Sequence, residues 1–361
     1  MRLATIHTTL PMTHHLSGIL AGDPVKTAAA ASLIYITANG SGIRRIKKGK
    51  GFIYLKDTLP VKDADTLSRI RSLVIPPAWR DVWICENPNG HLQCTGIDLK
   101  GRRQYRYHPI WSALRNETKF HRLVLFGKAL PQIRKTIRKH LREKGWSKQK
   151  VLAAAVSIMD KTGLRVGNHF YEKLYGSFGL STLQNRHLKI RGNQLLFSFR
   201  GKKGIEQRVT LRSARLARII AKCREIPGKE LFQYVDEAGQ HQAIHSEDIN
   251  TYIREVSGDL FSSKDFRTWV ATVTCVEALL QAGPAETEKQ KNECILQALD
   301  KVAATLGNTR AVCKKHYVHP LVLTAYETGR LFRYALRTAT ATPGNSRAES
   351  LLLKLLKKEA A

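Results

Sequence analysis

The hydrophobic pattern changes at about Pro109, and this change limits the chain to a two-part fold. From Ser32 to Pro109, short runs such as GFIYL and DVWIC are separated by Gly, Pro and Asn, which is typical of short strands and turns. Further on, apolar residues recur four apart, as at Ile133, Ile137 and Leu141, which is a helical spacing. The sequence predicts an α+β protein: a small, mainly β N-terminal domain and a larger, mainly α domain.

Each part contains one segment of the opposite kind. In the first part, DADTLSRIRSLV has a helical apolar face that ends at Pro76 and Pro77, because proline cannot continue a helix. In the same part, LIYIT is a strand candidate, and Asn89-Gly90 is a strong hairpin-turn signal. In the second part, HLKIRGNQLLFSFRGKKGIEQRVTL alternates and carries Gly-rich turns, which predicts a β-hairpin or three-stranded sheet inside the helical domain.

These patterns divide the chain into four segments. We expect a flexible leader at residues 1–34, a β-rich domain at 35–109, a helical catalytic domain at 110–338, and a linker with a short basic tail helix at 339–361. Thr, His, Pro and Asp interrupt the apolar residues of the leader, so the pattern does not predict a secretory signal.

The charge balance selects the partner. Sixty Lys and Arg face 29 Asp and Glu, a net charge of +31, which strains a compact fold unless a polyanion lies nearby. Nucleic acid is the first candidate and an anionic membrane surface the second. No run approaches the roughly 20 apolar residues of a membrane-spanning helix, so we expect a DNA partner and no membrane.

The six cysteines indicate neither disulfides nor metal. None forms a C-x-x-C pair, and no Cys/His group has zinc spacing. We therefore expect no metal site, and small buried side chains in a reducing compartment.

Five residues are candidates for chemistry, although each has an ordinary interpretation. Arg165 is a surface arginine or a buried one with an anionic partner, and Lys202 is a solvated residue of a hairpin tip or a mobile acid. Arg267 is a stacked structural arginine or a fixed phosphate ligand. Asn308 is the cap of the helix that follows it or a hydrogen-bond donor. Tyr317 is a packed ring or a nucleophile in a cationic setting.

Together, the five residue types are those that metal-free attack on a phosphodiester requires. Two guanidiniums can bind the non-bridging oxygens of the pentacoordinate phosphorus, and an amide can donate one further hydrogen bond. A lysine on a mobile hairpin can protonate the leaving oxygen. A phenol needs nearby cations to become a phenoxide near neutral pH.

The chain resembles the type IB DNA topoisomerases, specifically their short bacterial and poxvirus form, over roughly Gly40 to Leu331. Seven motifs occur in the family's order: IPPAW, GRRQYRYHP, RNETKF, LRVGN, FRGKKG, KDFRTW and GNTRAVCKKHYVHP. Several motifs in the correct order are far more specific than any one of them.

The resemblance implies a role for each catalytic candidate. Tyr317 attacks the phosphate and forms a 3′-phosphotyrosyl bond, releasing a 5′-hydroxyl. Arg165 and Arg267 bind the oxygens in the transition state, and Lys202 is the general acid. Asn308 stands where poxvirus and nuclear relatives have His, so we expect it to act by hydrogen bonding only.

The resemblance also implies the partner and its contacts. A monomer would close as a clamp on duplex DNA and relax supercoils without ATP, metal or any cofactor, in the cytoplasm at a bacterial nucleoid. Gln104, Tyr105 and Tyr107 match DNA-contacting positions of the family. The neighbouring Arg102 and Arg103, and the basic helix face with Arg138 and Lys139, are further DNA-binding candidates.

Two alternatives remain open at this stage. A tyrosine recombinase has a similar residue set but usually carries His-x-x-Arg, where this chain has Lys264-Asp-Phe-Arg267. A non-catalytic basic DNA-binding protein satisfies the charge but gives no reason for the five residues. Relaxation of supercoiled plasmid in EDTA without ATP distinguishes the topoisomerase from both.

Overall fold

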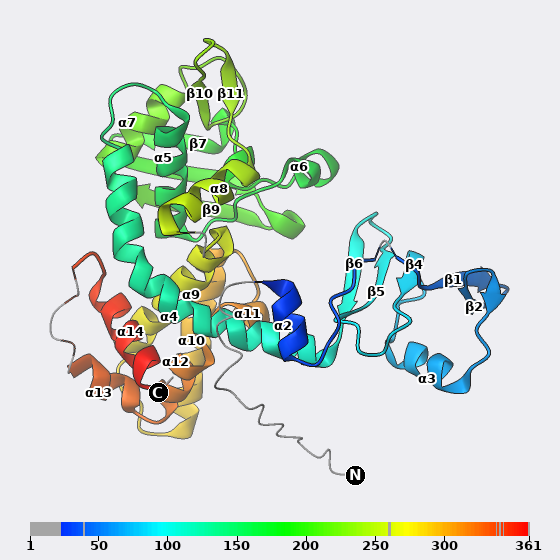
Figure 1. Ribbon diagram of the computed structural model, residues 1–361. Coiled ribbons are helices and arrows are strands. Elements are labelled where there is room, and N and C mark those ends of the chain that lie inside the picture. Colours follow the sequence, from blue (N-terminus) through cyan, green and yellow to red (C-terminus); the bar gives the residue numbers. More distant parts are fainter. Residues whose placement is uncertain are drawn as a thin grey trace. The chain divides into compact units, whose positions relative to one another are not determined.

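The chain forms two compact units, residues 1–121 and residues 122–361, drawn in Figure 1. The computed structural model describes residues 23–38, 40–258, 261–336, 338, 341 and 343–359, without the side chains of residues 116–121 and 359. The first unit is mainly β and the second mainly helical with small sheets, so the predicted α+β class is confirmed. The boundary between the units lies inside helix α4 (Pro109–His140). The switch to helix therefore comes where the sequence predicts it, but the first turns of α4 belong to the first unit.

A six-stranded antiparallel sheet with the order β3-β2-β1-β4-β5-β6 dominates the first unit. Helix α3 lies between β3 and β4 in the chain, where the sequence predicts a helical insertion, and Asp63 is its N-cap. The elements are α2 (Pro24–Ala30), β1 (Ile43–Lys48), β2 (Gly51–Lys56), β3 (Leu59–Pro60), α3 (Ala64–Ser72), β4 (Arg80–Ile84), β5 (Leu92–Ile97) and β6 (Arg103–Tyr107).

The Asn89-Gly90 hairpin exists but is wider than predicted. β4 and β5 pair as expected, yet residues 85–91 separate them rather than a two-residue turn. Gly90 is needed for space, because a Cβ there would lie 2.6 Å from Cys85 Sγ. The strand expected at LIYIT is also wrong: within it, only Ile34 forms an isolated bridge, to Gly90.

Part of the predicted flexible leader is folded. Asp23 caps α2 by accepting from Val25 N at 2.9 Å, and Pro24 occupies the first helical turn, where a missing N–H costs nothing. Ala28 and Leu33 then pack with Trp111 of α4. The leader prediction is therefore wrong for residues 23–34, and residues 1–22 lie outside the described part of the chain.

A buried histidine joins this segment to the sheet. His91 is 4% exposed and accepts from Ile36 N through Nδ1 at 3.0 Å. Its ring stacks on Tyr35 at 4.2 Å and meets Trp111 edge-on at 4.8 Å. Accepting at Nδ1 requires this nitrogen to be unprotonated, and burial lowers the pKa of His91.

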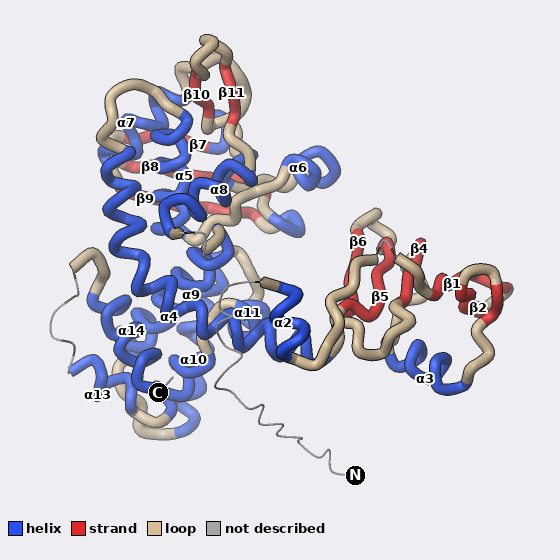
Figure 2. Tube along the Cα trace, viewed as in Figure 1, coloured by secondary structure: helices blue, strands red, loops and turns tan. Residues whose placement is uncertain are grey.

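The second unit surrounds one hydrophobic core and includes the predicted three-stranded sheet β7-β8-β9, seen in red among the helices of Figure 2. Its strands are β7 (Leu188–Arg191), β8 (Gln194–Arg200), β9 (Glu206–Arg212), β10 (Gln233–Val235) and β11 (His241–Ala243). Its helices after α4 are α5 (Lys148–Thr162), α6 (His169–Tyr175), α7 (Ala214–Cys223), α8 (Ser246–Ser257), α9 (Ser263–Ala282), α10 (Glu288–Leu306), α11 (Arg310–His316), α12 (Pro320–Glu327), α13 (Arg330–Leu336) and α14 (Arg347–Glu359). Three short 3₁₀ helices are η1 (Leu180–Thr182), η2 (Asn185–His187) and η3 (Lys202–Gly204).

Helix α5 is the central element of this core. Its residues 151–156 are all buried, and it packs against α7, α8 and α9. Ser147 caps its first turn, and Gly163 ends it in the left-handed conformation at φ 64°, which glycine adopts without strain. The predicted stripe of Ile133, Ile137 and Leu141 is also buried, so α4 contributes the adjacent wall.

The predicted tail helix forms, but it belongs to the core. Leu352 and Leu355 of α14 are fully buried, and Glu349 pairs with Arg134 of α4 at 2.8 Å. Arg134 also pairs with Asp160 of α5. Removing one partner of such a buried pair costs about 3–5 kcal/mol, so α14 stabilises the unit rather than extending from it.

The state of the cysteines and the apolarity of the helices can be compared with the sequence expectations. All six cysteines are unpaired, and five are buried, the exception being the partly buried Cys294. Across the described residues, no helix combines the length and the apolarity that crossing a membrane demands.

His91 gives a pH prediction for stability. Its pKa is below the ordinary 6.5 in the folded state, so the unfolded chain binds the proton more readily. The free energy of unfolding should hold above about pH 6.5 and fall as the pH decreases toward the lower folded pKa. Urea unfolding at about pH 7.5 and about pH 5.5 measures this loss. His91→Phe should show a smaller loss between the two conditions, and an equal loss would contradict the assignment.

Candidate active site

Arg267 is the fixed point of the site. It lies on α9, is only 4% exposed, and donates from Nη1 to Gly163 O and from Nη2 to Leu306 O. These carbonyls lie at the C-terminal ends of α5 and α10. Gly163 itself is the left-handed residue that ends α5, and the left-handed Gly307 directly follows Leu306 at the end of α10. The guanidinium therefore joins two helix ends and cannot turn away from them.

Tyr317 presents its ring to this guanidinium. It follows the last residue of α11, and its N–H donates to Cys313 O at 3.0 Å. Thr272 of α9 donates from Oγ1 to Tyr317 O at 3.0 Å. Arg267 Cζ lies 5.1 Å from the centroid of the Tyr317 ring. The ring is half-buried, and these backbone contacts hold the residue beside the guanidinium.

Arg165 and Asn308 complete the cluster. Arg165 Nη2 donates to Asn308 Oδ1 at 2.6 Å. The alternative interpretation of Asn308 as a helix cap is wrong, because Thr309 accepts from Val312 N and caps α11. Asn308 Nδ2 and Arg267 Nε are both buried, and neither has a hydrogen-bond partner among the described residues. Two donors are therefore available for an incoming acceptor.

The site is short of negative charge. Burial lowers the pKa of Arg165, and burial together with Arg165 lowers the pKa of Arg267 to about 10. Within the described part of the chain, these two guanidiniums donate to backbone carbonyl oxygens, to the Asn308 amide oxygen and to Tyr317 rather than to carboxylates. An anion between them would relieve the mutual repulsion.

The same cations act on the phenol. Burial by itself raises the pKa of Tyr317, but Arg267, Arg165 and Lys264 outweigh it and bring the pKa below its ordinary value of 10. Because a phenoxide is the stronger nucleophile, the environment favours the reactive form.

Lys202 lies on the β8–β9 hairpin, which contacts the cluster close to its tip. It is exposed in η3 at the hairpin tip, and Gly201 N donates to Ile205 O at 2.8 Å to close the turn. Gln207, on the returning strand, packs directly on Gly307, where any Cβ would collide with its amide. The structure therefore unites Arg165, Arg267, Asn308 and Tyr317, and anchors the hairpin of Lys202 beside Gly307.

The DNA-binding candidates of the first unit lie on the edge strand β6. Tyr105 and Tyr107 are exposed, and their rings stack at 6.1 Å and 10°. Arg103 is exposed as well. Arg102 and Gln104 both donate to Asp98 Oδ2 at 2.8 Å, and the pKa of Asp98 falls to about 2 chiefly through Arg102. These two side chains are thus held in place before any ligand binds.

The candidates of α4 behave differently. Arg138 and Lys139 are both exposed on α4. Arg138 also lines a cavity of about 940 Å³ that none of the five catalytic candidates lines.

Sequence reasoning missed several contributors. Gln207, Thr272 and Lys264 gave no local signal, because each acts through a segment distant in sequence. Helix α6, which begins four residues after Arg165, exposes Phe170, Tyr171 and Leu174. Its apolar composition suggests burial, and only the structure shows an unburied surface that could stack on bases.

Comparison with known proteins identifies the family. The family model for the catalytic core of eukaryotic DNA topoisomerase I matches residues 108–330, more than half of the chain. The chain belongs to the type IB DNA topoisomerases. It is therefore an isomerase that acts on DNA. The model for the N-terminal domain of bacterial DNA topoisomerase IB matches residues 51–98, inside the β-rich unit.

Viral type IB topoisomerases are among its relatives. DNA topoisomerase 1B of Acanthamoeba polyphaga mimivirus is 33% identical over 302 residues, covering 81% of this chain and 89% of the relative. DNA topoisomerase 1B of vaccinia virus (strain Copenhagen) is 24% identical over 289 residues, covering 77% and 87%. All five catalytic candidates fall within the matched catalytic core.

No group of three or more His, Cys, Asp and Glu side chains gathers into a possible metal site anywhere in the described residues.

The cationic setting of Tyr317 can be titrated. Arg165→Gln keeps a donor for Asn308 but removes one charge, so the pKa of Tyr317 should rise. NMR of ring-labelled tyrosine, with Tyr317→Phe to assign the signal, measures it. A signal that titrates at the same pH in Arg165→Gln would show that Arg165 does not act on the phenol.

Proposed function

We propose that this topoisomerase cuts one strand of duplex DNA through attack of Tyr317 Oη on a backbone phosphorus. The new O–P bond makes a 3′-phosphotyrosyl ester, and the broken P–O bond releases a 5′-hydroxyl. The observation that carries the proposal is the half-buried Tyr317 ring beside the buried Arg267, with Arg165 and Asn308 bound to each other in the same cluster.

Each residue has one task in this proposal. Arg267 and Arg165 bind the non-bridging oxygens, whose charge grows in the pentacoordinate transition state. Asn308 Nδ2, buried without a partner among the described residues, donates a further hydrogen bond. One such oriented donor is worth about 100- to 1,000-fold in rate. The phenol loses its proton to water, which its lowered pKa favours.

Lys202 delivers a proton to the leaving 5′-oxygen. The contact of Gln207 with Gly307 holds the hairpin tip near the cluster, and a lysine can supply that proton by general acid catalysis. The phosphotyrosyl ester conserves the energy of the cut bond, so religation runs the same steps in reverse without ATP. Torque in the DNA turns the free end between the two steps, and supercoils are lost.

DNA affinity comes from the exposed cations and aromatics. Tyr105, Tyr107 and Arg103 of β6 and Arg138 and Lys139 of α4 are placed for contact with phosphates or bases. We expect binding that weakens steeply with salt, because each phosphate contact releases counterions.

Tyr317→Phe tests the nucleophile. The variant loses one hydroxyl, so it should bind DNA but form no covalent adduct with supercoiled plasmid and relax none of it. Denaturing gels after incubation in EDTA without ATP measure the adduct. An adduct that survives in Tyr317→Phe would show that another tyrosine attacks.

Lys202→Ala tests the acid. Cleavage should slow by about 100- to 10,000-fold, and a 5′-thiol leaving group should restore the rate because a thiolate departs without a proton. Lys203→Asn is the matched control: it removes the adjacent charge, and Asn tolerates the φ of 64° at this position. Slow cleavage of the thiol substrate by Lys202→Ala would exclude Lys202 as the acid.

A further inference from the structure

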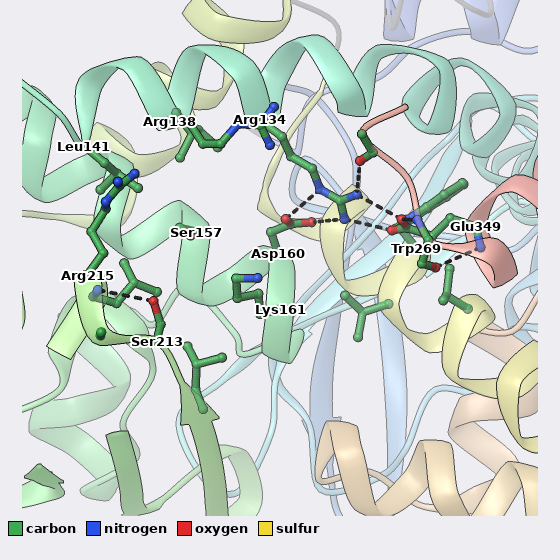
Figure 3. A pocket seen from close by; sticks show the side chains of 18 of the residues that line it. Arg134, Arg138, Leu141, Ser157, Asp160, Lys161, Ser213, Arg215, Trp269 and Glu349 are labelled. Atoms are coloured by element: carbon green, nitrogen blue, oxygen red, sulfur yellow. Dashed lines mark hydrogen bonds and ion pairs between the residues drawn. The ribbon is translucent and has the colours of Figure 1, made fainter. Parts of the chain in front are cut away.

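A buried ionic network joins four segments of the second unit behind the active site. Figure 3 shows Arg134 of α4 between Asp160 of α5 and Glu349 of α14, with Trp269 of α9 beside Glu349. Arg134 makes five hydrogen bonds: two to Asp160 at 2.8 and 2.9 Å, two to Glu349 at 2.9 and 2.8 Å, and one to Gly344 O at 2.9 Å. Since a guanidinium carries five N–H groups, every donor of Arg134 is used.

Glu349 is the centre of this network. Its Oε1 accepts from Trp269 Nε1 at 2.8 Å, and its Oε2 accepts from Ser346 N at 2.6 Å. Burial raises the pKa of Glu349, but the hydrogen bonds from Arg134 and Trp269 outweigh it and keep the pKa below its ordinary value. The carboxylate is therefore ionised, and its geometry is set by donors from three segments.

The network attaches to α9, which carries Arg267, and to α5, whose C-terminal end accepts a hydrogen bond from Arg267. Trp269 follows Arg267 by two residues on α9, and Asp160 precedes Gly163 by three residues at the end of α5. Gly163 O is the acceptor of Arg267 Nη1. Any shift of α5 against α9 would change this contact and the position of the guanidinium beside Tyr317.

Close packing around Gly127 and Gly163 restrains α9 relative to α4, α14 and the end of α5. A Cβ on Gly127 of α4 would collide with the Trp269 ring and with Leu353 of α14. A Cβ on Gly163 would lie 2.9 Å from Leu306 Cδ2 and 3.2 Å from Val270 Cγ1. Because interiors are close-packed, α9 cannot move relative to α5 while these contacts persist.

We propose that Glu349 is a positioning residue for strand cleavage: through Arg134 and Trp269 it holds α5 and α9 in the arrangement that fixes Arg267 beside Tyr317. The C-terminal helix is thereby part of the catalytic apparatus, although it touches no reacting atom. This inference rests on the role proposed above for Arg267.

The test uses the full chain and single-turnover cleavage of a DNA duplex with enzyme in excess. Glu349→Gln keeps the shape and one acceptor but removes the charge, and Trp269→Phe removes the indole donor together with part of the buried ring. Both should lower the cleavage rate by about 10- to 100-fold, as a small misplacement of a catalytic group does. DNA affinity at fixed salt should be unchanged. Glu293→Gln, at an exposed acid of α10, is the control and should cleave at the normal rate.

A double-variant comparison separates positioning from a general loss of structure. If Glu349 acts through Arg267, adding Glu349→Gln to Arg267→Lys should slow cleavage by less than about two-fold further. Multiplying effects in the double variant, or a normal rate in Glu349→Gln or Trp269→Phe, would overturn the inference. If thermal unfolding shows that Glu349→Gln is unfolded at the assay temperature, Trp269→Phe decides, because it leaves the ion pairs of Arg134 in place.

The single variant Arg267→Lys distinguishes a failure of the role proposed for Arg267 from a failure of the inference about Glu349. If it cleaves at the normal rate, the role proposed for Arg267 fails and the inference fails with it. If it is slow while folded Glu349→Gln is normal, only the inference about Glu349 fails.

Discussion

The active site depends on one buried guanidinium whose partners are backbone carbonyls. Arg267 bonds to the ends of α5 and α10, and helix C-termini carry partial negative charge. These helix ends hold the guanidinium in place without a carboxylate partner, which would carry a full negative charge. The candidate site therefore combines a fixed geometry with two guanidiniums that have no carboxylate bound to them in the described residues.

The catalytic candidates were identified from the sequence, but the contacts among them were not. Motif order identified Arg165, Arg267, Asn308 and Tyr317, and the structure brings all four together. The local signal at Asn308 was misleading, because Asn is a good cap and Thr309 is equally able to cap. Its actual partner, Arg165, is 143 residues away, and no local pattern can reveal such a contact.

For the fold too, the secondary-structure elements could be predicted from the sequence, but contacts between distant segments could not. Periodicity located the helices and the three-stranded sheet, because these depend on the nearest turns of chain. It failed where a segment's role depends on distant partners. Arg134 looks like its basic neighbours Lys135 and Arg138, yet it meets Asp160 and Glu349, which are 26 and 215 residues away. The same limit explains why the sequence predicts the closing helix but does not reveal its place in the core.

The position of β6 at the edge of its sheet has a consequence for self-association. An edge strand offers unpaired backbone groups to any other strand, and exposed edges are common sites of aggregation. Here Arg103 and Arg106 belong to that edge strand and are exposed to solvent. Like charges repel when two copies approach edge to edge, so the arginines that suit a polyanion also protect the concentrated protein from forming continuous sheets.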